Sequence, residues 1–194
     1  MYPVIKRGKS ITLREFDRSD LDALTAVYGD EETTRHLSFE PRTREQVASI
    51  IDRSIASATI EPRVEYALAA VENETKDLIG TWRLAYAPVS SAPPSTVGQL
   101  GDTAQFGCAI AARVWRKGYG VEGTSLLLNL AFHDLGIARV WGARGPGNEA
   151  SAALMRRLGF VDVERFPDHI VKNGQPRDSI AAILEHAAWD HARR

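Results

Sequence analysis

Hydrophobic and polar positions alternate early in the chain, over SITLREF (residues 10–16), and predict a strand there. A short helix over DLDALTAVYG follows, for which we expect Ser19 as the N-cap and an end near Gly29. The capping-box spacing of Thr43 and Gln46 predicts a second helix through VASIIDRSIASA. On that helix, the apolar residues that share one face are Val47, Ile50, Ile51 and Ile55. VEYALAAV and LIGTWRLAY alternate like strands, and the polar turn ENETKD between them predicts a hairpin.

The second half interleaves strands and helices. Strands are predicted over 102–110 and 138–143, and helices over 120–136 and 148–160, with Gly136 and Gly159 as C-terminal stops. Two closing strands, VDVERF and RDSIAAIL, precede a short tail helix through Trp189. This order predicts a mixed α+β fold in which at least one strand pair is parallel, with a right-handed crossover. Before it, residues 87–100 are rich in Pro and Ser and are expected to form a long loop.

Composition narrows the choice of partners. A chain of 194 residues with 44% hydrophobic content suits a single domain, 1–194. The 24 Lys and Arg nearly balance the 25 Asp and Glu, so no long-range attraction to nucleic acid or anionic lipid is expected. The lone Cys108 forms no internal disulfide, the opening MYPVIKRGK has no apolar signal core, and no apolar run approaches ~20 residues. We therefore expect a cytoplasmic protein without a membrane partner.

The glycine-rich stretch VWRKGYGVEG, residues 114–123, is the first candidate for chemistry. A helix that begins at Gly118 has unpaired N–H groups and a positive dipole end there, which together bind anions. Arg116 and Lys117 add positive charge where a diphosphate would lie. The stretch therefore indicates a phosphate-bearing cofactor, and the alternative is an ordinary turn with solvated cations.

GYGVEG also has the glycine spacing of a dinucleotide-binding loop, which opens a second possibility. That fingerprint belongs directly after a strand and is followed by an acidic residue at the end of the next strand. Here seven residues intervene, and the next strand ends at Arg144 instead. Since an Arg there suits a 2′-phosphate, an NADP-dependent oxidoreductase stays open as an alternative.

A second motif, NEASAALMRRLGF, begins with Asn148, whose amide is placed to cap a helix or to reach a ligand, and Ser151 lies one turn further along. With the glycine-rich loop, it resembles the GNAT acyl-CoA N-acyltransferase superfamily, in the branch similar to ribosomal-protein N-terminal acetyltransferases. WRKGYG, residues 115–120, falls on that family's pyrophosphate loop, although Trp115 replaces the usual Gln or Arg and Arg116 a frequent Gly. The early ITLREFDRSDLDAL and the later Gly-Phe pattern also match the branch.

The resemblance implies a GNAT fold, a mixed and mostly antiparallel sheet whose central parallel strands splay apart to admit acetyl-CoA. It places backbone contacts to pantetheine near Ile110 and Ala112, with Asn148 also touching the pantetheine. It further implies that the pyrophosphate is clasped by the loop residues Trp115, Arg116, Lys117, Gly118, Tyr119 and Gly120. No metal is expected, and a homodimer is common among similar proteins.

The resemblance also suggests how the reaction proceeds. Many relatives carry a Tyr proton donor where this chain has Met155, so Ser151 is the suggested donor, the alternative being a small helix residue beside the cofactor. Freeing an α-amine at pH 7 costs only about 1 to 1.5 kcal/mol, against about 4 to 5 kcal/mol for Lys, so an α-amine needs little help. We expect direct attack by the amine in a ternary complex.

Four residues are candidates for a general base, and none is favoured by sequence alone. They are His36 and Glu40 in RHLSFEP, and Asp168 and His169 in FPDHI. The RHLSFEP segment and residues 87–100 are expected to border the acceptor site. Cys108 is more typical of a small buried hydrophobe than of a nucleophile. The sequence predicts an acetyl-CoA-dependent N-acetyltransferase for a protein, peptide or small-molecule amine, and the second alternative is a catalytically silent acyl-CoA-binding module.

Overall fold

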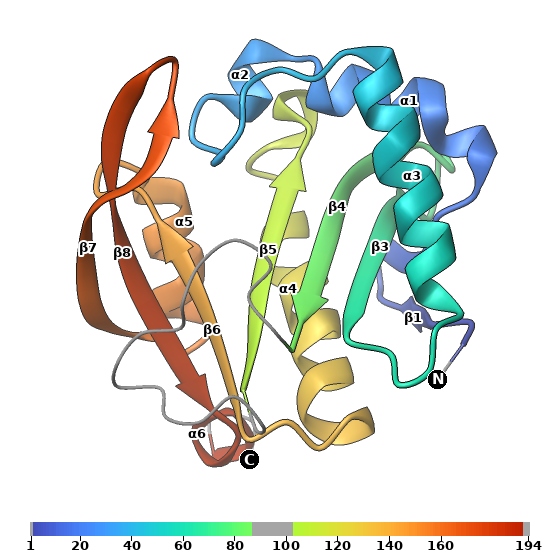
Figure 1. The fold of residues 1–194 in the computed structure, drawn as a ribbon. Coiled ribbons are helices and arrows are strands. Elements are labelled where there is room, and N and C mark those ends of the chain that lie inside the picture. Colours follow the sequence, from blue (N-terminus) through green and yellow to red (C-terminus); the bar gives the residue numbers. More distant parts are fainter. Residues whose placement is uncertain (1, 87–102, 192–194) are drawn as a thin grey trace.

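The protein folds around one 8-stranded sheet of order β1-β2-β3-β4-β5-β6-β8-β7 (Figure 1). The computed structural model describes residues 2–86 and 103–191, so the predicted loop at 87–100 lies outside the described residues. The strands are β1 (Ile5–Arg7), β2 (Ile11–Glu15), β3 (Glu65–Glu72), β4 (Leu78–Ala85), β5 (Thr103–Ile110), β6 (Arg139–Arg144), β7 (Val161–Lys172) and β8 (Gln175–Glu185). The helices are η1 (Arg18–Asp20), α1 (Leu21–Tyr28), α2 (Glu31–Thr34), α3 (Arg44–Ala58), η4 (Ala112–Val114), α4 (Tyr119–Asn129), η5 (Leu130–Asp134), α5 (Glu149–Arg157) and α6 (His186–His191).

The helices cover both faces of the sheet. Figure 1 shows α1 and α3 in front of β3 and β4, with α4 and α5 behind β5 and β6. Helix α4 packs closely because Gly123 has no side chain: a Cβ there would lie 2.5 Å from Cζ2 of the fully buried Trp82. Gly123 therefore serves packing, while the other glycines of its loop remain candidates for binding. Among the described residues, no helix has both the length and the apolar character needed to cross a membrane.

Of the two N-caps predicted in the first half of the chain, one is confirmed and one is wrong. Thr43 and Gln46 form the predicted capping box: the Gln46 N–H donates to Thr43 Oγ1 at 3.4 Å and the Thr43 N–H to Gln46 Oε1 at 3.0 Å. The prediction of Ser19 as N-cap was wrong. Asp17 caps the 3-10 turn η1 and its carboxylate accepts from the Ser19 N–H at 2.7 Å, while Asp20 is the N-cap of α1. The helical segment consequently begins earlier, as a 3-10 turn.

The first five strands form an antiparallel series, and the predicted β3–β4 hairpin is confirmed. The short β1 and the four-residue α2 were not predicted, since three or four residues carry too little periodicity to detect. An antiparallel first half is incompatible with the doubly wound sheet of a dinucleotide-binding domain. The NADP alternative loses its structural basis here.

The predicted parallel pair is β5 with β6, joined through α4, and the pairing is short. It runs from Thr103 opposite Arg139 to Gln105 opposite Trp141, while β5 continues to Ile110 and β6 to Arg144. Beyond these three pairs the strands separate, as Figure 1 shows for their upper ends. The splay predicted from the resemblance is therefore present, whereas the handedness of the crossover stays a prediction.

The C-terminal strands are longer than predicted. β7 and β8 contain 12 and 11 residues and join through Asn173 and Gly174, with φ of 51° and 69°. Two successive positive φ angles are those of a type I′ turn, for which Asn-Gly is the preferred pair. The strands therefore extend beyond the predicted VDVERF and RDSIAAIL, and FPDHI lies within β7.

Candidate functional site

The open edge of β5 is the first part of the site. Toward β4, the Ala111 N–H donates to the Ile79 carbonyl at 2.9 Å. Main-chain groups alternate in direction along a strand, so those of Cys108 and Ile110 point the other way, toward the gap left by β6. This gap exposes a row of main-chain donors and acceptors that suits an extended amide-bearing ligand.

The sequence singled out Ile110 and Ala112 for such contacts, and both lie at the end of this edge. The Ile110 carbonyl accepts from Trp115 Nε1 at 2.7 Å, and the Ala112 N–H donates to Thr33 Oγ1 at 2.9 Å. A carbonyl oxygen has a second lone pair, so Ile110 keeps capacity for a ligand. Ala112 would have to exchange its threonine partner. The Trp115 indole thus has a local role, fixing the loop against the strand.

The glycine-rich loop leaves main-chain N–H groups without a helical partner at the start of α4. Arg116 and Gly118 have positive φ, 65° and 87°, and Gly118 is the N-cap of α4 without a side-chain cap. The first helical bond runs from the Glu122 N–H to the Gly118 carbonyl at 3.2 Å, so the N–H groups of residues 119–121 precede the ladder. A Cβ at Gly118 would meet nothing within 4 Å. Unpaired N–H groups at a helix start are the donors that a bound anion would use, so the loop keeps its place as the predicted anion site.

The charged side chains around the loop differ in their availability. Arg116 is exposed and forms no ion pair with another described residue, whereas Lys117 Nζ lies 3.7 Å from Glu72 Oε1. The Tyr119 hydroxyl donates to Glu72, which lowers the pKa of Glu72 and raises that of Tyr119 to about 12. Arg116 is therefore the free cation, and Tyr119 offers a ligand only its main chain.

Asn148 begins α5 at the carboxyl end of β6, beside the same gap. Its Oδ1 caps the helix by accepting from the Ser151 N–H at 3.1 Å, which leaves the amide NH₂ for a ligand. Ser151 shares a helix face with Leu154 and Met155, one turn further on. Leu154 lies 3.8 Å from a Cβ placed on Gly120, and Met155 lies 3.0 Å from one on Gly142 of β6. That face therefore looks toward the start of α4 and the splay, which brings Ser151 to the same side of the sheet edge as the glycine-rich loop.

A cavity of about 390 Å³ adjoins Asn148. Its lining comes from the loop after α2, the β6–α5 loop and the β7–β8 hairpin: His36, Leu37, Gly145, Pro146, Gly147, Asn148, Ile170, Arg177 and Asp178. Of these, the hairpin residues were missed from the sequence, although the Asn-Gly turn at 173–174 signals that hairpin. Asn148 is shared between the cavity wall and the splay, so a molecule in the cavity would lie next to one in the gap.

His36 is the only one of the four candidate bases among the cavity-lining residues. Partial burial, followed by the positive charges of Arg35, Lys172 and Arg177, lowers its pKa below the ordinary value. The imidazole is consequently neutral at pH 7 and able to accept a proton.

The other three candidates are not among the cavity-lining residues, and their contacts engage a side chain for Glu40 and His169 but only the main-chain N–H for Asp168. Glu40 Oε1 accepts from the Asn173 N–H at 2.9 Å, the Asp168 N–H donates to Asp178 Oδ1 at 3.1 Å, and His169 packs on Phe166. Burial raises the pKa of the Cys108 thiol to about 12, which keeps it protonated and supports its exclusion as a nucleophile.

Lys172 ties two walls of the cavity together. It is buried near the turn of the β7–β8 hairpin, and its ammonium donates to the carbonyls of Thr34, Arg35 at 3.1 Å and Leu37 at 3.3 Å. These carbonyls lie at and beyond the end of α2, beside His36. The hairpin therefore holds the His36 segment in place.

Comparison with known proteins places this geometry in context. Residues 10–161 match the family described as "Acetyltransferase (GNAT) domain". An uncharacterized N-acetyltransferase of Bacillus subtilis, YoaA, is 26% identical over 92% of this chain and 94% of its own length. Spermidine N-acetyltransferase from Vibrio cholerae, solved with CoA and spermine, superposes with a TM-score of 0.75 at 17% identity, covering 94% of this chain and 99% of that one. Ribosomal-protein-S5-alanine acetyltransferase from Vibrio fischeri gives 0.73 at 19%, covering 96% and 98%.

Proposed function

Because the chain belongs to the GNAT acetyltransferase family, we propose that it moves the acetyl group of acetyl-CoA to a primary amine held in the cavity beside Asn148. The family establishes an acyltransferase with a GNAT fold. The observation that carries the finer proposal is the early end of β5–β6 pairing, at Gln105 and Trp141. The two strands then separate, and the starts of α4 and α5 lie at the open end of the gap between them. The cavity adjoins this gap at Asn148.

The main chain supplies most of the proposed cofactor contacts. The edge of β5 at Cys108 and Ile110 offers N–H and carbonyl groups to the pantetheine amides, and Asn148 adds its NH₂. The loop from Trp115 to Gly120 holds the diphosphate through N–H groups and Arg116. When bound, acetyl-CoA supplies an activated thioester carbonyl.

Two side chains assist the reaction. His36, neutral at pH 7, receives the proton that the attacking amine loses, directly or through water. Ser151 donates a hydrogen bond to the departing sulfur and keeps its own proton. A thiol of pKa ~8.5 is a good leaving group, so the sulfur leaves as thiolate and takes its proton from water. A main-chain N–H at the open edge of β5 stabilises the carbonyl oxygen as negative charge develops. The amine attacks directly while both substrates are bound.

Two classes of acceptor fit the cavity: an α-amine of a protein or peptide, and a small-molecule amine. The protein or peptide α-amine is supported by the branch that the early and late motifs resemble. The small-molecule amine is supported by the cavity volume of about 390 Å³. Residues 87–100 remain a proposed border of this site. A cytoplasmic location, suggested by the single cysteine, and a homodimer, suggested by resemblance alone, are further proposals.

Thiol release with acetyl-CoA and a panel of peptides and small amines, followed by intact-mass analysis, tests the proposal. We expect one product heavier by one acetyl group and stoichiometric release of CoA. Binding of acetyl-CoA without release for any amine would favour the silent binding module. Absence of acetyl-CoA binding by folded protein, measured by calorimetry, would refute the proposed site.

A further inference from the structure

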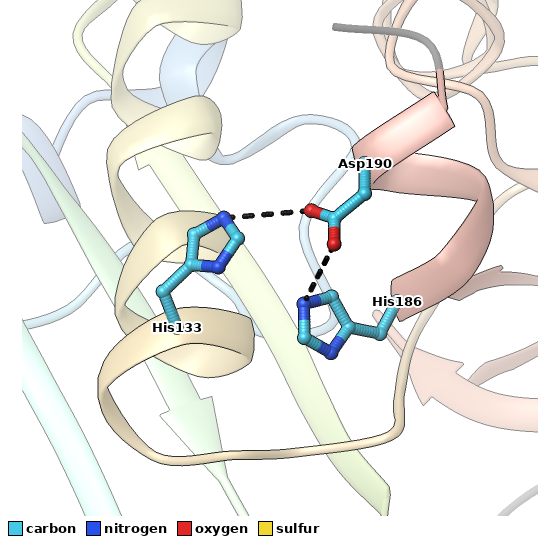
Figure 2. A group of neighbouring side chains, drawn as sticks. All are labelled: His133, His186 and Asp190. Atoms are coloured by element: carbon cyan, nitrogen blue, oxygen red, sulfur yellow. Dashed lines mark ion pairs between the residues drawn. The ribbon is translucent and has the colours of Figure 1, made fainter. Parts of the chain in front are cut away.

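A cluster of two histidines and one aspartate lies away from the gap. Figure 2 shows the side chains of His133, His186 and Asp190 turned toward one another. His133 belongs to η5, the π-helical turn after α4, and the other two are four residues apart on α6. The His186 N–H donates to the Ala138 carbonyl at 2.9 Å, next to the first residue of β6. The cluster is therefore at the amino end of β6, opposite the end that bears Asn148.

The distances suit a metal ion better than direct hydrogen bonds. His133 Nε2 lies 3.6 Å from Asp190 Oδ1, and His186 Nε2 lies 3.5 Å from Asp190 Oδ2. Hydrogen bonds between nitrogen and oxygen are about 2.7–3.2 Å long. Zinc bonds of about 2.0–2.2 Å in a tetrahedron separate neighbouring ligand atoms by about 3.3–3.6 Å. One donor atom from each of the three residues fits within 4.8 Å of the others, and the half-exposed His133 is free to adjust.

The His186 ring is already oriented for coordination. It stacks on Phe132 with centroids 4.9 Å apart and an interplanar angle of 4°. Its Nε2 is shielded from solvent and has no hydrogen-bond partner among the described residues. A buried nitrogen without a partner is costly, and a bound cation would satisfy it.

Of the carboxylates of Asp134, Glu185 and Asp190, two have a basic partner and the third is available to a metal. Asp134 pairs with Lys6, and Glu185 pairs with Arg139 at 2.9 Å. Within the described part of the chain, Asp190 pairs with no lysine or arginine and faces only the two histidines. Two imidazoles and one carboxylate are ligands that zinc, nickel and copper accept, whereas magnesium and calcium prefer oxygen.

We propose that His133, His186 and Asp190 form a divalent transition-metal site of the zinc class, with water completing the coordination. The metal fastens α6 to the end of α4, beside the contact in which Trp189 packs near Phe132 with centroids 6.1 Å apart. This departs from the sequence-based expectation of no metal. The sequence gives no spacing motif, because His133 is separated from α6 by a strand, a helix and a hairpin.

The test is calorimetry and thermal unfolding of untagged full-length protein with Zn²⁺, since a polyhistidine tag would itself bind the metal. We expect one Zn²⁺ per chain, no comparable binding of Mg²⁺, and a rise in Tm of about 5 °C at a hundredfold excess over Kd.

Single substitutions decide whether the three residues hold the ion. His133 is exposed and Asp190 is half-buried without a lysine or arginine partner in the described residues, so His133→Gln and Asp190→Asn should leave folding intact. Zn²⁺ affinity should drop about tenfold or more in each, and the Tm rise should disappear. His191→Gln, on the same helix but outside the cluster, is the matched control and should bind like the parent protein. No saturable Zn²⁺ binding, or equal binding by all three variants, would overturn the proposal.

Discussion

Arg116 shows how a single residue contributes both backbone shape and charge. Its φ of 65° belongs to the turn that leads into α4, and its guanidinium is free of ion pairs within the described residues. The sequence gives Lys117 the same predicted role, but its ammonium lies beside the carboxylate of Glu72. The two neighbouring cations should therefore contribute unequally to the binding of a diphosphate.

Reversing the charge of Arg116 tests that inequality. Arg116→Glu should raise the KM for acetyl-CoA about tenfold, because one exposed attraction becomes a repulsion, while the melting temperature stays unchanged. Arg113→Glu is the matched control, since Arg113 instead donates to the Leu78 carbonyl at 3.3 Å and lies 3.9 Å from Asp77. Steady-state kinetics on both variants measure the difference, and equal KM values would argue against the loop as the diphosphate site.

Asn148 combines a structural and a proposed binding role, and substitutions separate the two. Asn148→Asp keeps an oxygen that accepts from the Ser151 N–H but removes the NH₂ donor, so stability should hold while the KM for acetyl-CoA rises. Asn148→Ala removes both and should also lower the free energy of unfolding by about 1 kcal/mol. Chemical denaturation and kinetics distinguish the roles. If both variants retain the parent KM, Asn148 is only a helix cap.

At the scale of elements, the sequence predicted the ends of helices well where a capping side chain or a glycine marks them. Gly159 ends α5 with φ of 90°, and the Phe160 N–H donates to the Met155 carbonyl at 3.0 Å, as in the predicted Schellman ending. The lengths of β7 and β8 were less predictable. Their outer residues are mostly exposed, so neither alternation nor apolar content marks them, and only the Asn-Gly pair signals their shared turn.

The Schellman ending provides a test of α5. Gly159→Ala should lower the free energy of unfolding by about 1–2 kcal/mol, because a Cβ disfavours positive φ even though the nearest atom is 3.5 Å away. Gly107→Ala is the control, with open space around its Cβ and no positive φ. Urea denaturation of the two variants gives the comparison. Similar losses in both would mean that the conformation at Gly159 imposes no special strain.

At the scale of the whole molecule, the sequence predicted the α+β class and the parallel pair, and resemblance predicted the splay. It did not predict the cavity, which three segments far apart in the chain create together. His36 was a candidate base in the sequence, together with Glu40, Asp168 and His169. That only His36 of these four lines the cavity becomes visible in the fold, where Lys172 joins the hairpin to the segment after α2. Such an arrangement depends on long-range contacts that no local pattern encodes.

Global stability should fall at both ends of the pH range through the Tyr119–Glu72 contact. The folded pKa of Glu72 is lowered, so its contribution is present above the unfolded pKa of about 4.5 and is lost as pH falls through the folded value. The folded pKa of Tyr119 is raised to about 12, so its contribution is present below the unfolded value of 10.0 and is lost as pH rises between the two. Thermal unfolding across pH measures both limbs. In Tyr119→Phe the loss of thermal stability at alkaline pH that comes from this contact should disappear. If the variant loses stability at alkaline pH as the parent does, other groups cause that loss.

The early separation of β5 from β6 has a consequence for how such an enzyme diverges. Peptide groups at the exposed strand edge are identical whatever side chains the strand carries, so recognition of a shared donor survives extensive substitution. The wall of the proposed acceptor cavity, by contrast, is assembled from side chains on a hairpin and two loops. Drift in sequence should therefore change which amine is acetylated long before it changes the source of the acetyl group.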